Sequence, residues 1–444
     1  MKLLLINPSN EGEIPLGTPR NYSQEARSHL PPLGLLYLAG YLKARHDVKV
    51  VDMMVSGQDR DDVSGILQTF EPDLVGISAI ISLWPSVLDI IRIIKQYNSA
   101  IPIVLGGPNA TQYPVESLSH SEIDYLIVGY GQEPLMLLCN QIERGETGKG
   151  IDNCYAQNVP YTSYQKSFPI EYDLDAFPRP DRSAIPFEFY HVDFCPENPS
   201  TTMISSTGCP FRCAFCNCNH QIVHIRSADH VVAEMQAIQA MGIRSILFQD
   251  EIFTMKPKRV RVICEQLIEK RIQVHWSIKS RIDCIKPWMP ELMKKAGCFN
   301  IHFGIESGTD TTLARMNKGF TVEQVRQTVS VVKDAGLSCT GNFMLAYPGE
   351  NANDIRQTIT FAKELELDLA QFSITLDLPK TPMFDEAIKA GRRDGDPWSA
   401  FVKNPERVDL IEMFASDRFS PETLFEFLNE AYSSMQTLFD YKAQ

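Results

Sequence analysis

The first 150 residues alternate short apolar runs with longer stretches in which apolar residues recur at helical spacing. Such alternation is typical of β-α-β units, in which helices cross over between parallel strands. The stretches Leu33–Lys43 and Pro85–Tyr97 predict two of these helices. Five runs predict strands, namely Lys2–Ile6, Val48–Asp52, Leu74–Ser78, Ile103–Leu105 and Tyr125–Val128. The pattern therefore predicts an α/β domain over residues 1–150, built on a doubly wound, flavodoxin-like parallel sheet.

A second alternating series follows a proline-rich stretch at residues 151–199, which we interpret as a linker. The series runs over residues 200–385. Its six candidate strands are Met203–Ser206, Ser245–Gln249, Val274–Ile278, Ile301–Ile305, Gly341–Ala346 and Gln371–Leu376. Six units are fewer than the eight of a closed barrel, so the series predicts a partial (β/α)6 barrel that is open on one side. Residues 386–444 predict a C-terminal helical region that is rich in aromatic side chains.

Three cysteines lie close together directly after the first strand of the second series. Cys209, Cys213 and Cys216 have the spacing C-x3-C-x2-C. Thiolates at such spacing bind iron–sulfur clusters, zinc or copper(I). A cubane cluster usually has four cysteine ligands, so three would leave one iron open to the amino and carboxylate groups of a methionine moiety. Zinc stays an alternative because Cys218 and His220 could complete a four-ligand set, although the second paired knuckle of most zinc sites is absent.

Composition limits the other classes of function. The chain has 444 residues and a formal net charge of −13, which argues against nucleic-acid binding through bulk charge. Its N-terminus predicts a strand and is too short in apolar residues for a secretory signal. No run reaches the roughly 18 apolar residues of a membrane span. Eleven cysteines in such a chain are more typical of thiols or metal ligands than of disulfides. We therefore expect a cytoplasmic protein without a nucleic-acid partner or a transmembrane segment.

The segment GCPFRCAFC at residues 208–216 resembles the cluster loop of the radical S-adenosylmethionine superfamily. This resemblance extends over about residues 200–380 and implies a 4Fe-4S cluster held by Cys209, Cys213 and Cys216. The family places its active site at the top of a six-unit partial barrel, which agrees with the number of strands predicted from the pattern. In such barrels the active-site residues lie at the carboxyl ends of the strands.

Four strand ends carry segments similar to the cobalamin-dependent branch of this superfamily. The resemblance implies that Asp250 and Glu251 hold the methionine amine, although Asp250 could also cap a helix. Arg281 is implied near the methionine carboxylate, with an ion pair to Asp283 as the alternative. The remaining two segments place Glu306 near the ribose hydroxyls and Tyr347 at the turn beside adenine.

The first domain resembles the cobalamin-binding domain that precedes this class of barrel. Glycines at strand ends let the backbone approach a large flat ligand, although they could also serve only as turns. The resemblance implies a cobalamin site at Ser78, Ile80, Gly106, Gly107, Gly129, Gly131 and Glu133. The motif D-x-H-x-x-G is absent, so no histidine is marked as a lower ligand of cobalt.

Together the two resemblances imply a radical enzyme that makes a 5′-deoxyadenosyl radical and works with cobalamin. The leading hypothesis is methylation of an unactivated carbon of a small molecule, with an external electron donor. An oxidative cyclase or rearrangement enzyme of the same branch is the second hypothesis. A non-catalytic iron–sulfur or zinc protein is the third. The C-terminal aromatics, such as Trp398 and Phe427, favour packing, and they would indicate an apolar substrate if they took part in recognition.

Overall fold

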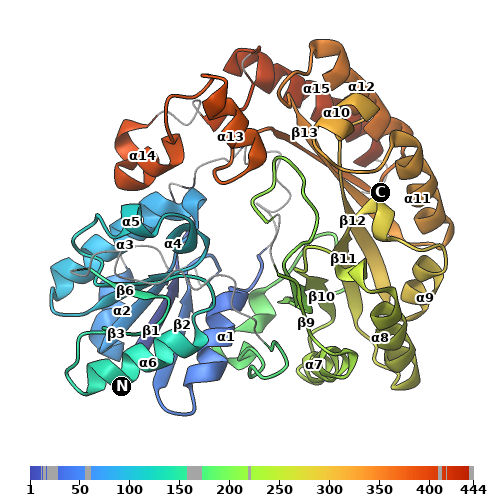
Figure 1. The fold of residues 1–444 in the computed structure, drawn as a ribbon. Coiled ribbons are helices and arrows are strands. Elements are labelled where there is room, and N and C mark those ends of the chain that lie inside the picture. Colours follow the sequence, from blue (N-terminus) through green and yellow to red (C-terminus); the bar gives the residue numbers. More distant parts are fainter. Residues whose placement is uncertain are drawn as a thin grey trace.

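The computed structural model describes residues 1–11, 13, 17, 29–55, 62–157, 173–218, 222–408, 413–416 and 418–439. Two six-stranded sheets form the framework, and they belong to two units that lie side by side (Figure 1). Within the described residues, no helix is long and apolar enough to cross a membrane.

The first sheet has the strand order β2-β1-β3-β4-β5-β6. Its strands are β1 (Lys2–Asn7), β2 (Asp47–Asp52), β3 (Leu74–Ser78), β4 (Ile103–Gly106), β5 (Tyr125–Ile127) and β6 (Cys154–Ala156). The first five are parallel and confirm the predicted doubly wound sheet. The sixth is antiparallel to β5 and lies in the stretch expected to be a linker. Its three residues are too few to show a strand period, and pairing with β5 defines it.

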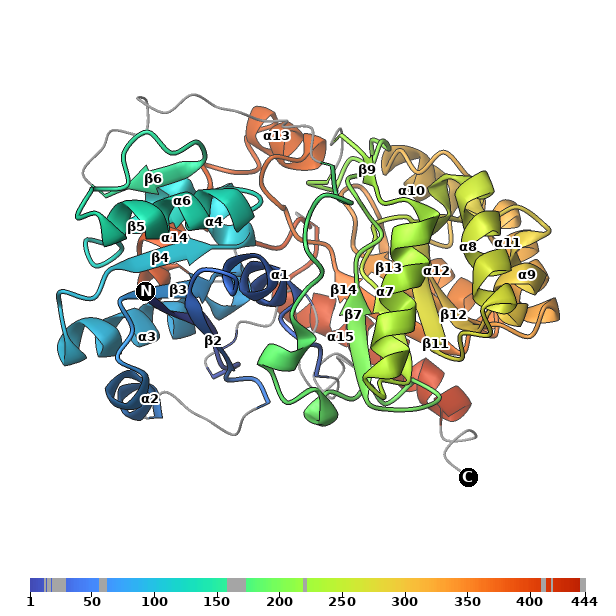
Figure 2. The ribbon, with the colours of Figure 1, turned by 90° about the horizontal axis from the view of Figure 1, so that it is seen from below.

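Helices cover both faces of the first sheet (Figure 2). They are α1 (Leu33–Leu42), α2 (Asp62–Phe70), α3 (Trp84–Tyr97), α4 (Pro108–Gln112), α5 (Pro114–Ser117) and α6 (Gln132–Glu143). Leu36 of α1 and Leu138 of α6 pack in one buried layer, whereas Leu67 of α2 and Ile91 of α3 pack in the other. The strand order reverses between β1 and β3, because β2 lies on one side of β1 and the later strands lie on the other. Such a switch point leaves a crevice at the carboxyl ends of the strands.

The second sheet is parallel throughout and has the order β14-β13-β12-β11-β10-β7. Its strands are β7 (Ser200–Met203), β10 (Ser245–Phe248), β11 (His275–Ser280), β12 (Cys298–Glu306), β13 (Ser338–Leu345) and β14 (Leu369–Ile374). The predicted six units are confirmed in sequence order. Since β7 and β14 form the two edges, the barrel stays open (Figure 1).

An outer row of helices buries the convex face of this second sheet (Figure 1). The helices are α7 (Ala228–Ala240), α8 (Pro257–Glu269), α9 (Met289–Lys295), α10 (Asp310–Arg315), α11 (Val322–Asp334) and α12 (Ala352–Glu364). Alternate strand residues such as Ile301, Phe303 and Ile305 face these helices and form the core. The intervening residues point into the concave side, as the two-residue period of a strand requires.

The C-terminal region contacts both sheets through α13 (Pro382–Lys389), α14 (Pro397–Lys403) and α15 (Pro421–Phe439). Helix α14 returns to the first sheet, where Trp398 is buried and the indole of Trp84 donates to the carbonyl of Val402 at 2.9 Å (Figures 1 and 2). Helix α15 packs on the second sheet, where the hydroxyl of Tyr432 bonds the backbone of Phe372. The buried aromatics Trp398 and Phe427 therefore act in packing, as predicted.

Candidate active site between the two sheets

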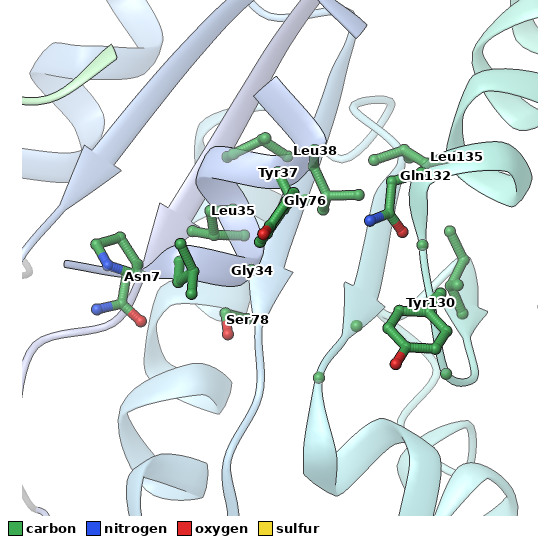
Figure 3. Close-up of a pocket in the computed structure, with 18 of the residues that line it drawn as sticks. Asn7, Gly34, Leu35, Tyr37, Leu38, Gly76, Ser78, Tyr130, Gln132 and Leu135 are labelled. Carbon is green, nitrogen blue, oxygen red and sulfur yellow. The ribbon is translucent and has the colours of Figure 1, made fainter. Parts of the chain in front are cut away.

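A cavity of about 310 Å³ lies at the carboxyl edge of the first sheet (Figure 3). The first-sheet side of its wall includes Asn7, Gly34, Tyr37, Ser78, Gly106, Gly107, Gly129, Tyr130, Gly131 and Gln132. Ile204, Thr207 and Arg226 line it from the second unit. The cavity therefore occupies the predicted switch-point crevice, and both units contribute to its wall.

Glycines shape this cavity in two different ways. A β-carbon added at Gly34 or Gly106 would meet no protein atom within 4 Å, so both positions border open space. Gly107 instead has a φ of 101°, and a β-carbon there would lie 2.8 Å from the carbonyl oxygen of Ala79. The first two glycines leave room for a ligand, whereas the third permits a backbone turn that side chains disfavour.

Not every residue predicted for the first domain's site reaches the cavity. Ser78 and the four predicted glycines line it, but Ile80 and Glu133 do not. Ile80 is 37% exposed, and the side chain of Glu133, the second residue of α6, is also exposed. Both side chains are exposed, and neither contributes to the cavity wall.

Two tyrosines in the wall were not predicted. The hydroxyl of Tyr130 donates to the hydroxyl of Thr207 at 2.7 Å, which joins the loop after β5 to the second unit. Burial raises the pKa of Tyr130 and of Tyr37, so both phenols stay protonated near neutral pH. Tyr130 lies between the two predicted glycines Gly129 and Gly131, and this position in the sequence could have predicted that Tyr130 lines the cavity.

The cysteine loop lies between two short antiparallel strands, β8 (Ser206–Thr207) and β9 (His224–Ile225). Backbone bonds at Ala214 fix it to neighbouring segments, because its amide donates to Met316 and its carbonyl accepts from Met383. Gly208, which begins the loop, has a φ of 84°, and a β-carbon there would lie 2.2 Å from the carbonyl oxygen of Ile222. Only glycine fits this position.

The three predicted thiols lie near one another. Burial is the main cause that raises the pKa of Cys209, and the neighbouring Cys216 and Cys213 raise it further. A hydrogen bond from the Cys218 thiol lowers the pKa of Cys216 to about 7. Within the described residues, no three histidine, cysteine, aspartate or glutamate side chains converge on a single metal ion. His220 lies outside the described residues.

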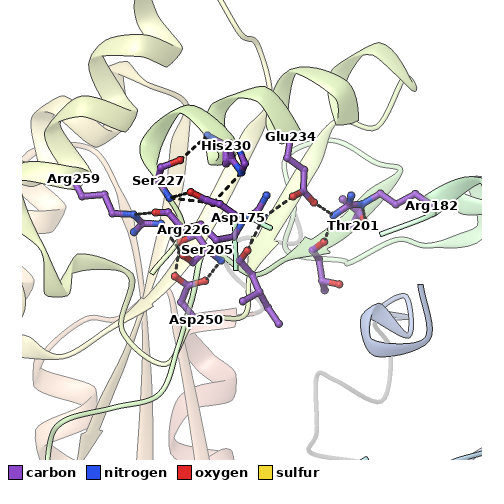
Figure 4. A network of polar contacts seen from close by, with 12 residues as sticks. Asp175, Arg182, Thr201, Ser205, Arg226, Ser227, His230, Glu234, Asp250 and Arg259 are labelled. Carbon is purple, nitrogen blue, oxygen red and sulfur yellow. Dashed lines mark hydrogen bonds and ion pairs between the residues drawn. The ribbon is translucent and has the colours of Figure 1, made fainter. Parts of the chain in front are cut away.

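Asp250 and Glu251 follow β10 but have different surroundings. The carboxylate of Asp250 is fully buried and accepts from the amide of Ser205 at 2.6 Å and from the hydroxyls of Ser205 and Ser206 at 2.5 and 2.6 Å (Figure 4). Asp250 therefore caps no helix and instead holds the strand end before the cysteine loop. Glu251 is partly exposed and accepts from the amide of Gly208, and burial raises its pKa.

Arg281 lies against the cysteine loop. Its guanidinium forms two hydrogen bonds with Asp283, at 2.9 and 3.0 Å, and a third with the Cys213 sulfur at 3.4 Å. It also stacks 3.8 Å from the ring of Phe211 and donates to the carbonyl of Lys318. The alternative ion pair with Asp283 is therefore present and is buried on the arginine side. The contacts of Arg281 with Cys213 and Phe211 connect the loop to the end of β11.

Glu306 ends β12, and Tyr347 lies two residues after the end of β13. Glu306 has a φ of 71° and accepts from the buried ammonium of Lys318 at 3.1 Å, a partner that sequence reasoning missed. Gly304 makes this pair possible, because a β-carbon there would lie 2.4 Å from the Glu306 carboxylate. The amide of Tyr347 donates to Glu350 at 2.9 Å, and burial raises the pKa of Glu350 to about 7.

Two family models match the chain. The radical SAM superfamily model matches residues 203–362, and the B12 binding domain model matches residues 22–138. The uncharacterized methyltransferase PH0819 from Pyrococcus horikoshii is 30% identical over 98% of this chain and 92% of its own length. The chain belongs to the cobalamin-dependent radical SAM family.

Further relatives of this radical SAM protein differ in their named reactions. An anaerobic magnesium-protoporphyrin IX monomethyl ester cyclase from Rubrivivax gelatinosus is 29% identical over 97% of this chain and 78% of its own length. The fold matches the radical SAM methyltransferase TsrM from Kitasatospora setae, with a TM-score of 0.73, 18% identity and coverage of 98% and 89% of the two chains. It also matches OxsB, with a TM-score of 0.73, 16% identity and coverage of 96% and 66%.

The residues of this radical SAM protein fit the cofactors that its family implies. A radical SAM domain implies a 4Fe-4S cluster and S-adenosylmethionine, and a B12 binding domain implies cobalamin. Three neighbouring thiols suit a 4Fe-4S cluster, in which each thiolate binds a different iron. The open space beside Gly34 and Gly106 suits a large cofactor at the edge of the first sheet.

Proposed function

We propose that this enzyme methylates an unactivated carbon of a small-molecule substrate. The observation that carries the proposal is the position of Thr207, which lines the cavity and stands two residues before Cys209. The cavity proposed for cobalamin therefore opens next to the loop proposed for the cluster. When bound, the cluster and S-adenosylmethionine supply a 5′-deoxyadenosyl radical, and cobalamin supplies a methyl group.

The residues around the cysteine loop have separate proposed roles. Cys209, Cys213 and Cys216 bind the cluster, and Glu251 accepts a hydrogen bond from the methionine amine, because its carboxylate lies at the loop and is partly exposed. Asp250 and Arg281 form several hydrogen bonds with protein partners and position the loop. Glu306 with Lys318, and the turn at Tyr347, complete the site proposed for the ribose and adenine.

On the other side, Ser78, Gly106, Gly107, Gly129 and Gly131 form the wall proposed for cobalamin. The proposed contacts of Ile80 and Glu133 lie away from this wall, so a ligand would reach them only at the rim. An external electron donor and a cytoplasmic location complete the proposal.

Anaerobic reconstitution tests it. We expect protein supplied with iron, sulfide, cobalamin, reductant and S-adenosylmethionine to release 5′-deoxyadenosine. The Cys213→Ala variant should release none. Cys284→Ser is the control, because Cys284 lies near Cys209 but outside the C-x3-C-x2-C spacing. Cleavage by Cys213→Ala would contradict the cluster assignment.

Oxidative cyclisation is the second candidate, and the match to the magnesium-protoporphyrin cyclase over 97% of this chain favours it. The product mass separates the two reactions. Methylation adds the mass of one methylene group to the substrate, whereas oxidative cyclisation removes hydrogen.

A further inference from the structure

Arg226 is a buried cation in the cavity wall that the proposed chemistry does not use. It follows β9 in the second unit, its side chain is 7% exposed, and it lines the cavity opposite the first sheet. A buried guanidinium is costly unless it is paired, and every donor of a buried polar group needs an acceptor. Its partners therefore determine what it can do.

Protein groups satisfy only part of this guanidinium. Its Nη1 donates to the Glu234 carboxylate at 2.6 Å and to the carbonyl of Ile204 at 3.0 Å. Glu234 is fully buried and is shared with a second arginine, Arg182, at 2.8 Å (Figure 4). The Nε atom of Arg226 has no hydrogen-bond partner in the described part of the chain, and its nearest carboxylate oxygen, on Asp175, is 3.9 Å away. Two buried arginines thus share one buried glutamate.

Tyr37 approaches the same part of the cavity from the first unit. It belongs to α1, lines the cavity and has a pKa that burial and Glu234 raise and Arg226 lowers. A phenol from one unit and a guanidinium from the other therefore border the same space. Both groups are hydrogen-bond donors near neutral pH.

We propose that Arg226, together with Tyr37, binds an oxygen acceptor of the corrinoid. This inference rests on the proposed function, since it assumes that cobalamin occupies the cavity. The corrinoid presents two kinds of oxygen acceptor, the amide carbonyls around its ring and the phosphodiester of its nucleotide. Because Arg226 belongs to the second unit and Tyr37 to the first, the proposed binding site needs both units in contact.

Arg182 provides a matched control for Arg226. Both arginines are buried and pair with Glu234, but Arg182 bonds Thr201 and Thr202 and does not line the cavity. Replacement by lysine keeps the charge beside Glu234 and removes the remaining guanidinium donors. We expect Arg226→Lys to raise the Kd for aquocobalamin about ten-fold, as for the loss of a charged hydrogen bond. Arg182→Lys should change the Kd by less than about two-fold.

The experiment is a titration of the full chain with aquocobalamin, followed by absorbance, with thermal unfolding of the ligand-free variants alongside. Tyr37→Phe serves if Arg226→Lys does not fold, because it removes one hydroxyl and breaks no ion pair; we expect a Kd about three-fold higher. Equal Kd values for wild type, Arg226→Lys and Tyr37→Phe would overturn the inference. Failure of the wild type to bind the corrinoid would overturn the proposed function, and this inference with it.

Cobinamide, which lacks the nucleotide and its phosphodiester, identifies the acceptor. If Arg226 binds the phosphodiester, Arg226→Lys weakens cobalamin binding and leaves cobinamide binding unchanged. If it binds a ring amide, both corrinoids lose affinity equally. Either result supports the inference, whereas an equal loss in Arg182→Lys would show that the shared pair with Glu234 acts only on the fold.

Discussion

The two cofactor regions of this radical SAM protein are built from different materials. The cavity wall at the first sheet consists largely of glycines and aliphatic side chains, and Gly34 and Gly106 border empty space. The cysteine loop is instead surrounded by charged side chains that are already paired, such as Arg281 with Asp283 and Glu306 with Lys318. The cavity at the first sheet has empty space for a ligand, whereas hydrogen bonds and ion pairs hold the cysteine loop in place. Substitutions should therefore damage the two regions by different routes.

The largest expected effect is the loss of one cluster ligand. Cys209→Ala removes one of the three proposed thiolate ligands, so we expect no 4Fe-4S absorbance and no 5′-deoxyadenosine. The corrinoid should still bind, because Cys209 does not line the cavity. Anaerobic absorbance spectra of the reconstituted variant, with and without aquocobalamin, measure both. Loss of corrinoid binding together with the cluster would contradict the expectation that the cavity forms independently of the cluster.

The opposite substitution fills the cavity. Gly106→Leu places a side chain in open space, so we expect corrinoid affinity to fall about 100-fold while the cluster absorbance and the fold stay intact. Gly65→Leu is the control, because a β-carbon at Gly65 also meets no atom within 4 Å, its φ is not positive, and it lies in α2 away from the cavity. Unchanged corrinoid affinity in Gly106→Leu would place the cofactor elsewhere.

The third prediction concerns the hydrogen bonds that hold the loop. Asp250→Ala leaves the amide and hydroxyl of Ser205 and the hydroxyl of Ser206 without their acceptor, and we expect a loss of about 3 kcal/mol in the free energy of unfolding. Urea unfolding measures this loss. Asp229→Ala, on the exposed start of α7, should cost less than about 1 kcal/mol. A loss of similar size in both variants would show that the buried carboxylate has no special role.

The smallest effect is a pH dependence at the turn after β13. Burial raises the pKa of Glu350 from 4.5 to about 7, so the folded state holds its proton more tightly than the unfolded state. Stability should therefore fall as pH rises from 4.5 to about 7, by at most about 3 kcal/mol, and then stay level. Glu350→Gln should remove this part of the slope in unfolding measured at pH 5, 6 and 7. An unchanged slope would assign the dependence to other groups.

The strand–helix alternation was enough to predict both sheets, because buried parallel strands and crossover helices leave strong apolar periods in the sequence. β6 escaped prediction because its three residues carry no period, and β5 alone determines its place. The sequence pattern also did not predict that α14 packs against the first unit. Trp398 belongs to an ordinary apolar helix in the sequence, and only the folded chain brings it beside the first sheet.

The sequence by itself predicted the cysteine loop, because the C-x3-C-x2-C spacing falls directly after a predicted strand. It also placed Asp250, Glu251, Arg281 and Glu306 at strand ends. The tertiary structure decided which of these side chains are already occupied, since Asp250 meets Ser205 and Arg281 meets Cys213 only across long separations in the chain. It also decided that Tyr37 and Arg226 border one cavity. The spacing of neighbouring residues predicts local motifs, whereas contacts between residues distant in the chain depend on how the two units pack.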